Sequence, residues 1–186
     1  ALWYSNYLPL LFLISAVAVG LAMITVESRL SGRVFGHHLS GRILSELGAA
    51  QLVMLLLYGV VRLTDLAARG ALDEIFRMTQ ESWLFLVEFG VGVILPAVLL
   101  ASARRRRNMR VLYGASLLTV LGFILHRLNV SMTALEATRG EPYVPALGEA
   151  VATLMFIGLG FAAFHLAARY LHLFPHDDEP IQVGRD

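Results

Sequence analysis

Residues 111–133, VLYGASLLTVLGFILHRLNVSMT, decide the fold of this 186-residue chain. The run is apolar and long enough to cross a bilayer as a helix, which takes about 20 residues. Inside it lies His126-Arg127-Leu128-Asn129. A charge near the centre of a membrane-spanning helix costs about 2.5–3.5 kcal/mol on insertion scales, so it normally faces protein or water and has a partner. The stretch therefore predicts a membrane-spanning helix with a paired arginine.

The rest of the chain has the same character. Hydrophobic residues make up 57% of the sequence and charged residues 16%, whereas soluble domains carry about 25% charge. The sequence predicts an all-α, polytopic transmembrane helical bundle that forms a single domain over residues 1–186. Its five transmembrane helices are expected at residues 8–26, 43–66, 82–103, 111–135 and 146–173, with a kink at Pro96 in the third.

The composition excludes several function classes. There are no cysteines, so this chain contains no cysteine-ligated iron–sulfur cluster, disulfide or thiol nucleophile. No basic aromatic surface suggests nucleic acid. Zinc motifs, nucleophile–base signatures and glycine-rich phosphate loops are absent, so the sequence does not support self-contained enzyme chemistry. The first residues, Ala1-Leu2-Trp3-Tyr4, favour the later part of a longer protein whose N-terminal bundle is missing.

The arginines predict the orientation. All 15 basic residues are arginine, and residues 104–110 hold five of them. Arg29, Arg33 and Arg42 lie in or beside the loop after the first helix. The positive-inside rule places both loops and the C-terminus in the cytoplasm. The arginine run itself is interpreted as a topology determinant that contacts lipid headgroups.

Depth suggests a partner for Arg127. At a rise of about 1.5 Å per residue, Glu88 lies roughly 9 Å from the outer start of its helix and Arg127 about 12 Å from the outer end of its own. We therefore predict a Glu88–Arg127 ion pair, because either ion alone in the membrane would carry the full desolvation penalty. His126, Asn129 and Glu149 also fall in the outer half. The pair either takes part in proton transfer or only locks helices together.

A second charged group lies towards the other surface. It consists of Glu27, Arg42 and Glu46, and Gln51 and Tyr58 lie at depths between the two groups. Carboxylates, amides, phenols and imidazoles across a membrane are what a proton path requires. The alternative is that Glu27, Arg42 and Glu46 only cap helices or extend towards the membrane surface.

A haem group is not expected. Two histidine ligands to one haem must lie at matching depth on neighbouring helices. His126 falls in the outer half of its helix, whereas His165 falls near the inner end of the last helix. The sequence therefore predicts neither a bis-histidine haem nor another metal site.

Several stretches together resemble a known family. They are Leu8-Pro9-Leu10-Leu11-Phe12-Leu13 with Ser15, Gly20 and Glu27; Glu88 through Pro96; Arg127-Leu128 with Ser131; and Tyr143-Val144-Pro145 followed by Glu149. In this order and spacing they resemble the NrfD-like family of polysulfide reductase membrane subunits. The resemblance is closest to its HybB-type branch, the membrane subunit of respiratory [NiFe] hydrogenases, and spans nearly the whole chain.

The resemblance implies a function. Members of the family lack haem and hold a menaquinone or ubiquinone site near an outer ferredoxin-like iron–sulfur subunit, which relays electrons from a catalytic subunit such as a [NiFe] hydrogenase. They lie in the bacterial cytoplasmic membrane, and HybB-like proteins have about ten helices, of which this chain would match the last five. Glu88, His126, Arg127 and Glu149 would then serve proton transfer or subunit packing.

Other functions stay open at this stage. The chain could serve another complex of the same family, such as alternative complex III or a sulfur-compound or nitrite reductase. It could be a purely structural membrane anchor, or a haem b protein.

Overall fold

The computed structural model describes residues 5, 7–35, 40–76, 79–139 and 146–170, and every regular element among them is a helix. Two compact units divide the chain after Glu141, and each is considered by itself. The all-α prediction is confirmed. Four helices are long and apolar enough to cross a membrane, namely those covering Leu8–Gly32, Gly41–Ala68, Ser82–Leu100 and Met109–Met132.

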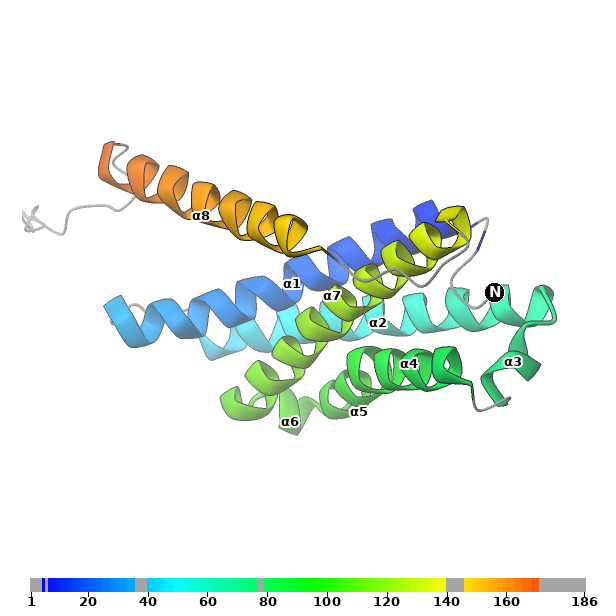
Figure 1. The fold of residues 1–186 in the computed structure, drawn as a ribbon. Helices are drawn as coiled ribbons and strands as arrows, with labels where there is room; N and C mark the ends of the chain where they lie inside the picture. Colours follow the sequence, from blue (N-terminus) through cyan, green and yellow to red (C-terminus); the bar gives the residue numbers. More distant parts are fainter. Residues whose placement is uncertain (1–4, 6, 36–39, 77–78, 140–145, 171–186) are drawn as a thin grey trace, which may run out of the picture. The chain divides into compact units, whose positions relative to one another are not determined.

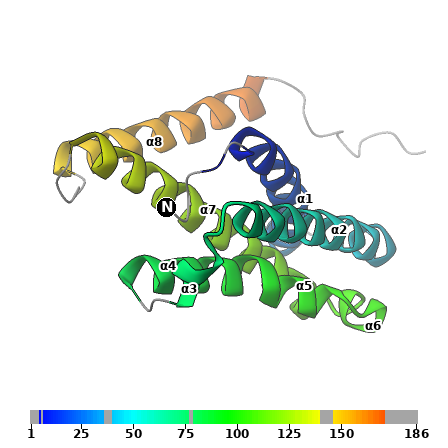
Figure 2. The ribbon, with the colours of Figure 1, turned by 90° about the vertical axis from the view of Figure 1, so that its right-hand side faces the viewer.

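The first unit is built from these four spans (Figures 1 and 2). Its elements are α1 (Leu8–Phe35), α2 (Gly41–Ala68), the short α3 (Leu72–Phe76), α4 (Gln80–Phe89), the π-helical turn η1 (Gly90–Ile94), α5 (Leu95–Leu100), the short α6 (Ala103–Arg106) and α7 (Met109–Arg139). The second unit contains α8 (Leu147–Tyr170), whose apolar part covers Leu147–Ala163.

The predicted helix positions are close to the observed ones, apart from a longer first helix and two short helices, α3 and α6, in stretches predicted to connect helices. The first helix continues beyond residue 26 to Phe35. It passes through Ser31-Gly32, a pair that often marks a turn, because a single glycine weakens a helix without ending it and no proline follows before residue 35. The arginine run, expected to connect two helices without structure of its own, holds the short helix α6. Apolar length alone cannot predict either feature, because a helix can extend past the membrane surface.

Pro96 alters the third span in a specific way. Proline has no backbone N–H, and its ring clashes with the carbonyl four residues earlier in a regular helix. Here the chain forms the π-helical turn η1 directly before it, in which the Leu95 N–H donates to the Gly90 carbonyl. The irregularity expected at Pro96 is thus present as a π turn. Phe85, Glu88, Gly92 and Pro96 are all buried, so they remain on one inner face across this turn.

Close packing brings the third span against α7. Gly92 in η1 faces Gly122 in α7, and a Cβ built on Gly92 would lie 2.8 Å from the Gly122 Cα atom. No side chain fits between two backbones at this distance, so both glycines are required for the crossing. Glu88 lies one helical turn before Gly92, and His126 lies one turn after Gly122. The crossing therefore places Glu88 beside His126.

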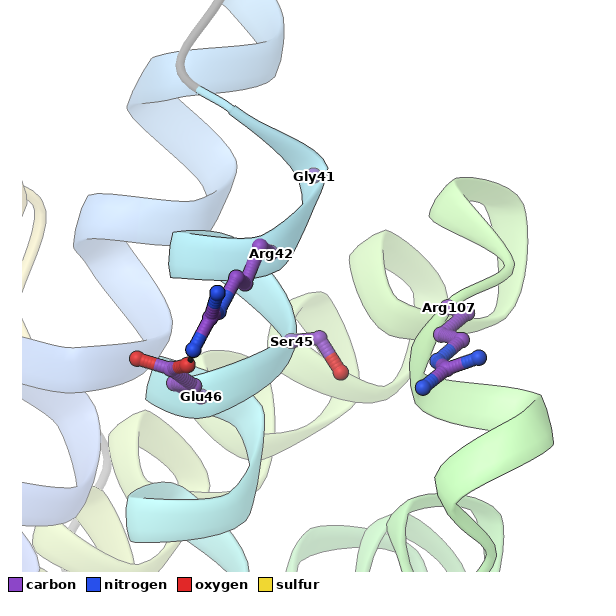
Figure 3. Close-up of a pocket in the computed structure, with 5 residues that line it drawn as sticks. All are labelled: Gly41, Arg42, Ser45, Glu46 and Arg107. Carbon is purple, nitrogen blue, oxygen red and sulfur yellow. Dashed lines mark hydrogen bonds and ion pairs between the residues drawn. The ribbon is translucent and has the colours of Figure 1, made fainter.

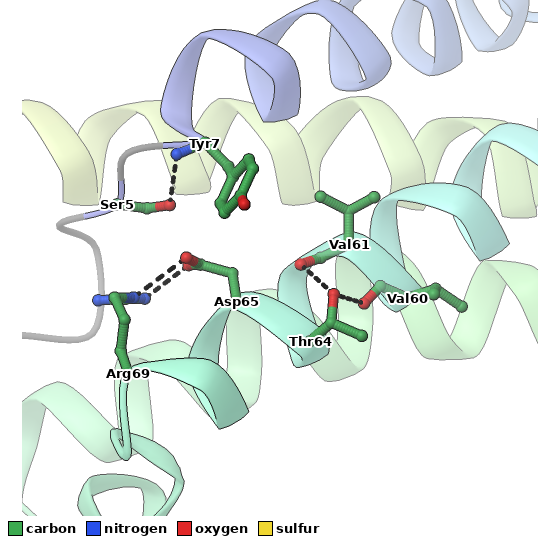
Figure 4. Close-up of polar contacts among 7 residues, drawn as sticks. All are labelled: Ser5, Tyr7, Val60, Val61, Thr64, Asp65 and Arg69. Carbon is green, nitrogen blue, oxygen red and sulfur yellow. Dashed lines mark hydrogen bonds and ion pairs between the residues drawn. The ribbon is translucent and has the colours of Figure 1, made fainter.

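The two ends of the first unit differ in charge. We call the end where α1 and α5 finish and α2 and α7 begin the arginine end, since α6 lies there. There, Arg29 Nη1 donates to the Met109 carbonyl at 2.6 Å, joining α1 to α7. We call the opposite end the α3 end. Asp65 is buried there and accepts two hydrogen bonds from Arg69, of 2.7 and 3.1 Å (Figure 4).

Candidate functional site

Four polar side chains meet inside the first unit and are called the Glu88 cluster. They are Glu88 on α4, His126 and Asn129 on α7, and Tyr58 on α2. Each is less than a tenth exposed. The Glu88 Oε1 atom lies 2.5 Å from His126 Nδ1, and Glu88 Oε2 accepts a hydrogen bond from Asn129 Nδ2 at 2.8 Å. The Tyr58 hydroxyl lies 3.4 Å from His126 Nε2.

This arrangement can hold and pass a proton. The contact between Glu88 and His126 needs one hydrogen, carried either by the imidazole or by the carboxyl group. Asn129 donates its NH₂ hydrogen to Oε2, so a proton held by Glu88 would sit on Oε1, the oxygen that faces His126. On the other side of the ring, His126 Nε2 faces a phenol that can donate or accept. The cluster thus links a carboxylate, an imidazole and a phenol in series.

The predicted Glu88–Arg127 ion pair is replaced in the structure by this Glu88–His126 contact. The Arg127 side chain is exposed, and its guanidinium carbon lies 5.5 Å from the centre of the Phe12 ring. The reason is helix geometry. Successive residues of an α-helix point about 100° apart, so positions 126 and 129 share a face that position 127 does not. The matching positions of Glu88 and residues 126–127 along their helices agree with the prediction, whereas the helix face was not considered. Tyr58, expected between the two charged groups, lies beside His126 instead.

A second buried group, called the Gln51 cluster, joins α2 to α7. Gln51 Nε2 donates to Thr119 Oγ1 at 2.9 Å, and Ser116 Oγ donates to Gln51 Oε1 at 3.0 Å. Thr119 also donates to the Ala115 carbonyl at 3.0 Å. All three side chains are fully buried, and none is ionisable. The cluster therefore satisfies its own polar atoms without any group that could hold a charge.

The two clusters repeat along a pair of parallel helices. Gln51 pairs with Thr119 and Tyr58 with His126, and the sequence separation is 68 residues in both pairs. On each helix the second residue comes seven positions after the first, which is two helical turns, or about 10 Å along the axis. Leu55 and Phe123 are buried between the clusters, and the Phe123 ring meets Tyr58 edge-on at 4.9 Å between centroids. An apolar layer therefore separates the neutral cluster from the ionisable one.

Arg62 is a buried charge that the sequence analysis did not single out. It lies one turn beyond Tyr58 on α2 and is fully buried, with its guanidinium carbon 5.7 Å from the centre of the Phe85 ring. Ser116 and Thr119 were missed as well. A three- and four-residue spacing of polar residues along α2 and α7 could have revealed all of them, because it marks the buried face of a helix.

The remaining predicted residues lie elsewhere. Glu27 and Glu46 are exposed, and Glu46 accepts from Arg42 Nε at 3.1 Å across one turn of α2. Glu149 is exposed in the first turn of α8, in the second unit. The side chain of His165 and residues Tyr143 and Pro145 lie outside the described residues. Within the described part of the chain, no group of three or more His, Cys, Asp or Glu side chains could hold a metal.

The family model described as "Polysulphide reductase, NrfD" matches residues 1–136, a range that includes both buried clusters. This match covers well over half of the chain. No solved structure matches.

Three curated proteins are similar to the chain. A "Probable Ni/Fe-hydrogenase 2 b-type cytochrome subunit" of Escherichia coli K12 is 27% identical over 94% of this chain and 45% of its own length. The "Menaquinone reductase, integral membrane subunit" of Nitratidesulfovibrio vulgaris Hildenborough is 25% identical over 91% of this chain and 44% of its own length. A further protein of that organism is 28% identical over 95% of this chain and 48% of its own length. The chain spans about half the length of the curated relatives it matches.

Proposed function

The chain belongs to the polysulphide reductase NrfD family, and we propose that it is part of the quinone-linked membrane subunit of a respiratory oxidoreductase. It anchors redox subunits at the outer membrane surface and passes their electrons to menaquinone or ubiquinone. The names of two relatives support this proposal, since one names a Ni/Fe-hydrogenase and the other a menaquinone reductase.

The Glu88 cluster is the observation that carries the proposal. Reduction of a quinone to a quinol takes two electrons and two protons, and a buried site must deliver those protons by side chains or water. A carboxylate, an imidazole and a phenol in hydrogen-bonding series are groups that can do so. A helix bundle that served only as an anchor would have no need for an ionisable group at this depth, because burying one is costly.

The partner complex is proposed from the resemblance and from the names of the relatives. We propose a [NiFe] hydrogenase with a ferredoxin-like iron–sulfur subunit as the electron donor, because the HybB-type resemblance and one relative's name agree. The arginine end then faces the bacterial cytoplasm and the α3 end faces outward. The chain uses quinone as substrate and holds no haem. Another complex of the family, such as a menaquinone reductase, is the alternative partner.

A structural anchor is the second candidate. The observation that favours it is that the same contacts join three helices, since Glu88 on α4 bonds α7 and His126 on α7 contacts α2. In that case the cluster fixes the packing of the bundle. The two candidates predict different results for a substitution that keeps the shape of the cluster.

Glu88→Gln tests the proposal in the full-length protein within its native complex. The amide keeps the size of the side chain and can still accept from Asn129, but it cannot release a proton. We expect electron transfer to quinone to fall by about tenfold or more per assembled complex, a loss within the range of general acid–base catalysis. Electron transfer from the peripheral subunits to an artificial dye should stay unchanged.

Asp73→Asn is the control, because it replaces an exposed carboxylate on α3 that belongs to neither buried cluster. It should leave both activities unchanged. If Glu88→Gln lowers the amount of assembled complex but not the quinone turnover of what assembles, the cluster serves packing and the chain is an anchor.

A further inference from the structure

A hollow of about 590 Å³ lies at the arginine end of the first unit, away from both buried clusters. Its lining residues are Gly41, Arg42, Ser45, Glu46 and Arg107 (Figure 3). α2 begins at Gly41, and Arg107 directly follows α6. The hollow therefore lies at the end of the membrane-length helix α2, at the level where lipid headgroups lie. We propose that it binds the phosphate group of an anionic phospholipid.

The arginines of this end divide into two kinds. Arg29 and Arg106 donate to backbone carbonyls, Arg29 to Met109 and Arg106 to Leu100 and Ala101. These two guanidinium groups stabilise helix ends. Arg107 is unlike these two, because its guanidinium has no hydrogen bond or ion pair with any residue that the structure describes, which is also true of its exposed neighbours Arg104 and Arg105. Arg107 borders the hollow and is exposed.

The charges of the hollow complement a phosphodiester. Arg42 and Arg107 are positive and Glu46 is negative, which leaves one net positive charge opposite the single negative charge of a phosphodiester. Arg42 uses Nε to donate to Glu46, which orients its side chain along α2. Figure 3 shows Ser45 between the Arg42–Glu46 pair and Arg107. Two planar guanidinium groups and a hydroxyl suit the oxygens of a phosphate group.

A lipid fits this site better than free phosphate. On α2, the face that carries Glu46 continues towards the α3 end with Val53, Leu57 and Val60, at helical spacing. All three are large apolar side chains that are more than two-fifths exposed, within a membrane-length span. The acyl chains of a lipid can pack against this apolar stripe, whereas an inorganic phosphate ion has no apolar part to do so. The charged hollow and the apolar stripe together match the two parts of a phospholipid.

Arg107→Gln tests the site in the full-length protein purified in detergent with its native subunits. Native mass spectrometry would count phosphatidylglycerol bound per complex, with phosphatidylcholine as the zwitterionic comparison. We expect phosphatidylglycerol affinity to fall about fivefold, which corresponds to about 1 kcal/mol per basic residue at a membrane surface. Arg105→Gln is the matched control, since Arg105 is exposed on α6 but does not line the hollow. It should leave the affinity unchanged.

The other results would overturn the proposal. Equal losses in the two variants would mean diffuse attraction to the arginine run, and no loss with Arg107→Gln would mean that the hollow binds no lipid. Millimolar inorganic phosphate should fail to displace phosphatidylglycerol. If phosphate displaces it completely, the hollow is a site for a free anion.

Discussion

The two buried clusters occupy equivalent places on the same pair of helices but differ in chemistry. In each, a side chain of α2 meets a side chain 68 residues later on α7. At the Gln51 cluster every group is neutral, and hydrogen bonds within the group satisfy them. At the Glu88 cluster a third helix adds a carboxylate, and an imidazole replaces the hydroxyl.

The difference between the clusters distinguishes contacts that only pack helices together from contacts that can also carry a proton. Neutral hydrogen bonds between membrane helices stabilise the fold by about 0.6 kcal/mol each, and they need no ionisable group. If the facing sides of α2 and α7 served only to join the two helices, a second neutral contact like that of Gln51 with Thr119 would be enough. The carboxylate and imidazole at the second position carry a desolvation cost that helix packing does not require. That cost supports the proposal that the Glu88 cluster takes part in proton transfer.

The largest expected effect comes from breaking the Glu88–His126 contact. His126→Phe leaves the buried carboxylate without its imidazole partner, and we expect a loss of about 3 kcal/mol in the free energy of unfolding. Adding Glu88→Leu removes the carboxylate as well and should recover most of this loss, because the carboxylate that had lost its partner is then gone. Denaturant titration of the full-length protein in detergent would measure both values.

The double variant also separates stability from function. Its stability should approach that of the unaltered protein, while quinone turnover stays low, because no proton-carrying group is left at this position. Recovery of turnover together with stability would contradict a role in proton transfer. Failure of Glu88→Leu to recover stability would contradict the interpretation that the unpaired charge is the cause of the loss.

Gln51→Leu should have a smaller effect, confined to stability. Ser116 and Thr119 lose their shared partner, although Thr119 keeps its bond to the Ala115 carbonyl. We expect a loss of about 1 kcal/mol in the free energy of unfolding, measured in the same titration. Quinone turnover per assembled complex should not change. A turnover loss comparable to that of Glu88→Gln would mean that the neutral cluster also belongs to the reaction, and the contrast between the clusters would disappear.

The sequence predicted the helices and their inner face better than the pairs between them. Apolar length identified four membrane-length helices in the first unit, and spacing placed Phe85, Glu88, Gly92 and Pro96 on one buried face. Those features depend on local periodicity, which a single chain displays. The π turn before Pro96 depends on how a backbone avoids one clash, and several helical irregularities would satisfy that need equally well.

The partner of Glu88 shows where sequence reasoning falls short. Depth alone made Arg127 and His126 equivalent, because they are adjacent. The rotation of α7 about its axis decides between them, and this rotation is set by the Gly92–Gly122 crossing. Two glycines thirty residues apart carry no sign that they meet. The buried pattern Ala115, Thr119, Phe123, His126 on α7 would have favoured His126 by periodicity.

Tyr58→Phe is expected to give the smallest effect and tests how far the Glu88 cluster extends towards α2. The Tyr58 hydroxyl lies 3.4 Å from His126 Nε2, a long contact that contributes about 0.5 kcal/mol or less to stability. The ring and its edge-on packing against Phe123 remain in the variant. If the phenol passes protons to His126, turnover should fall severalfold while the free energy of unfolding hardly changes.

Thr64→Val is a suitable control for Tyr58→Phe, because it removes an exposed hydroxyl from α2 that bonds only the backbone of its own helix. Equal turnover in the two variants would limit the reactive part of the cluster to Glu88 and His126, and α2 would then contribute packing alone.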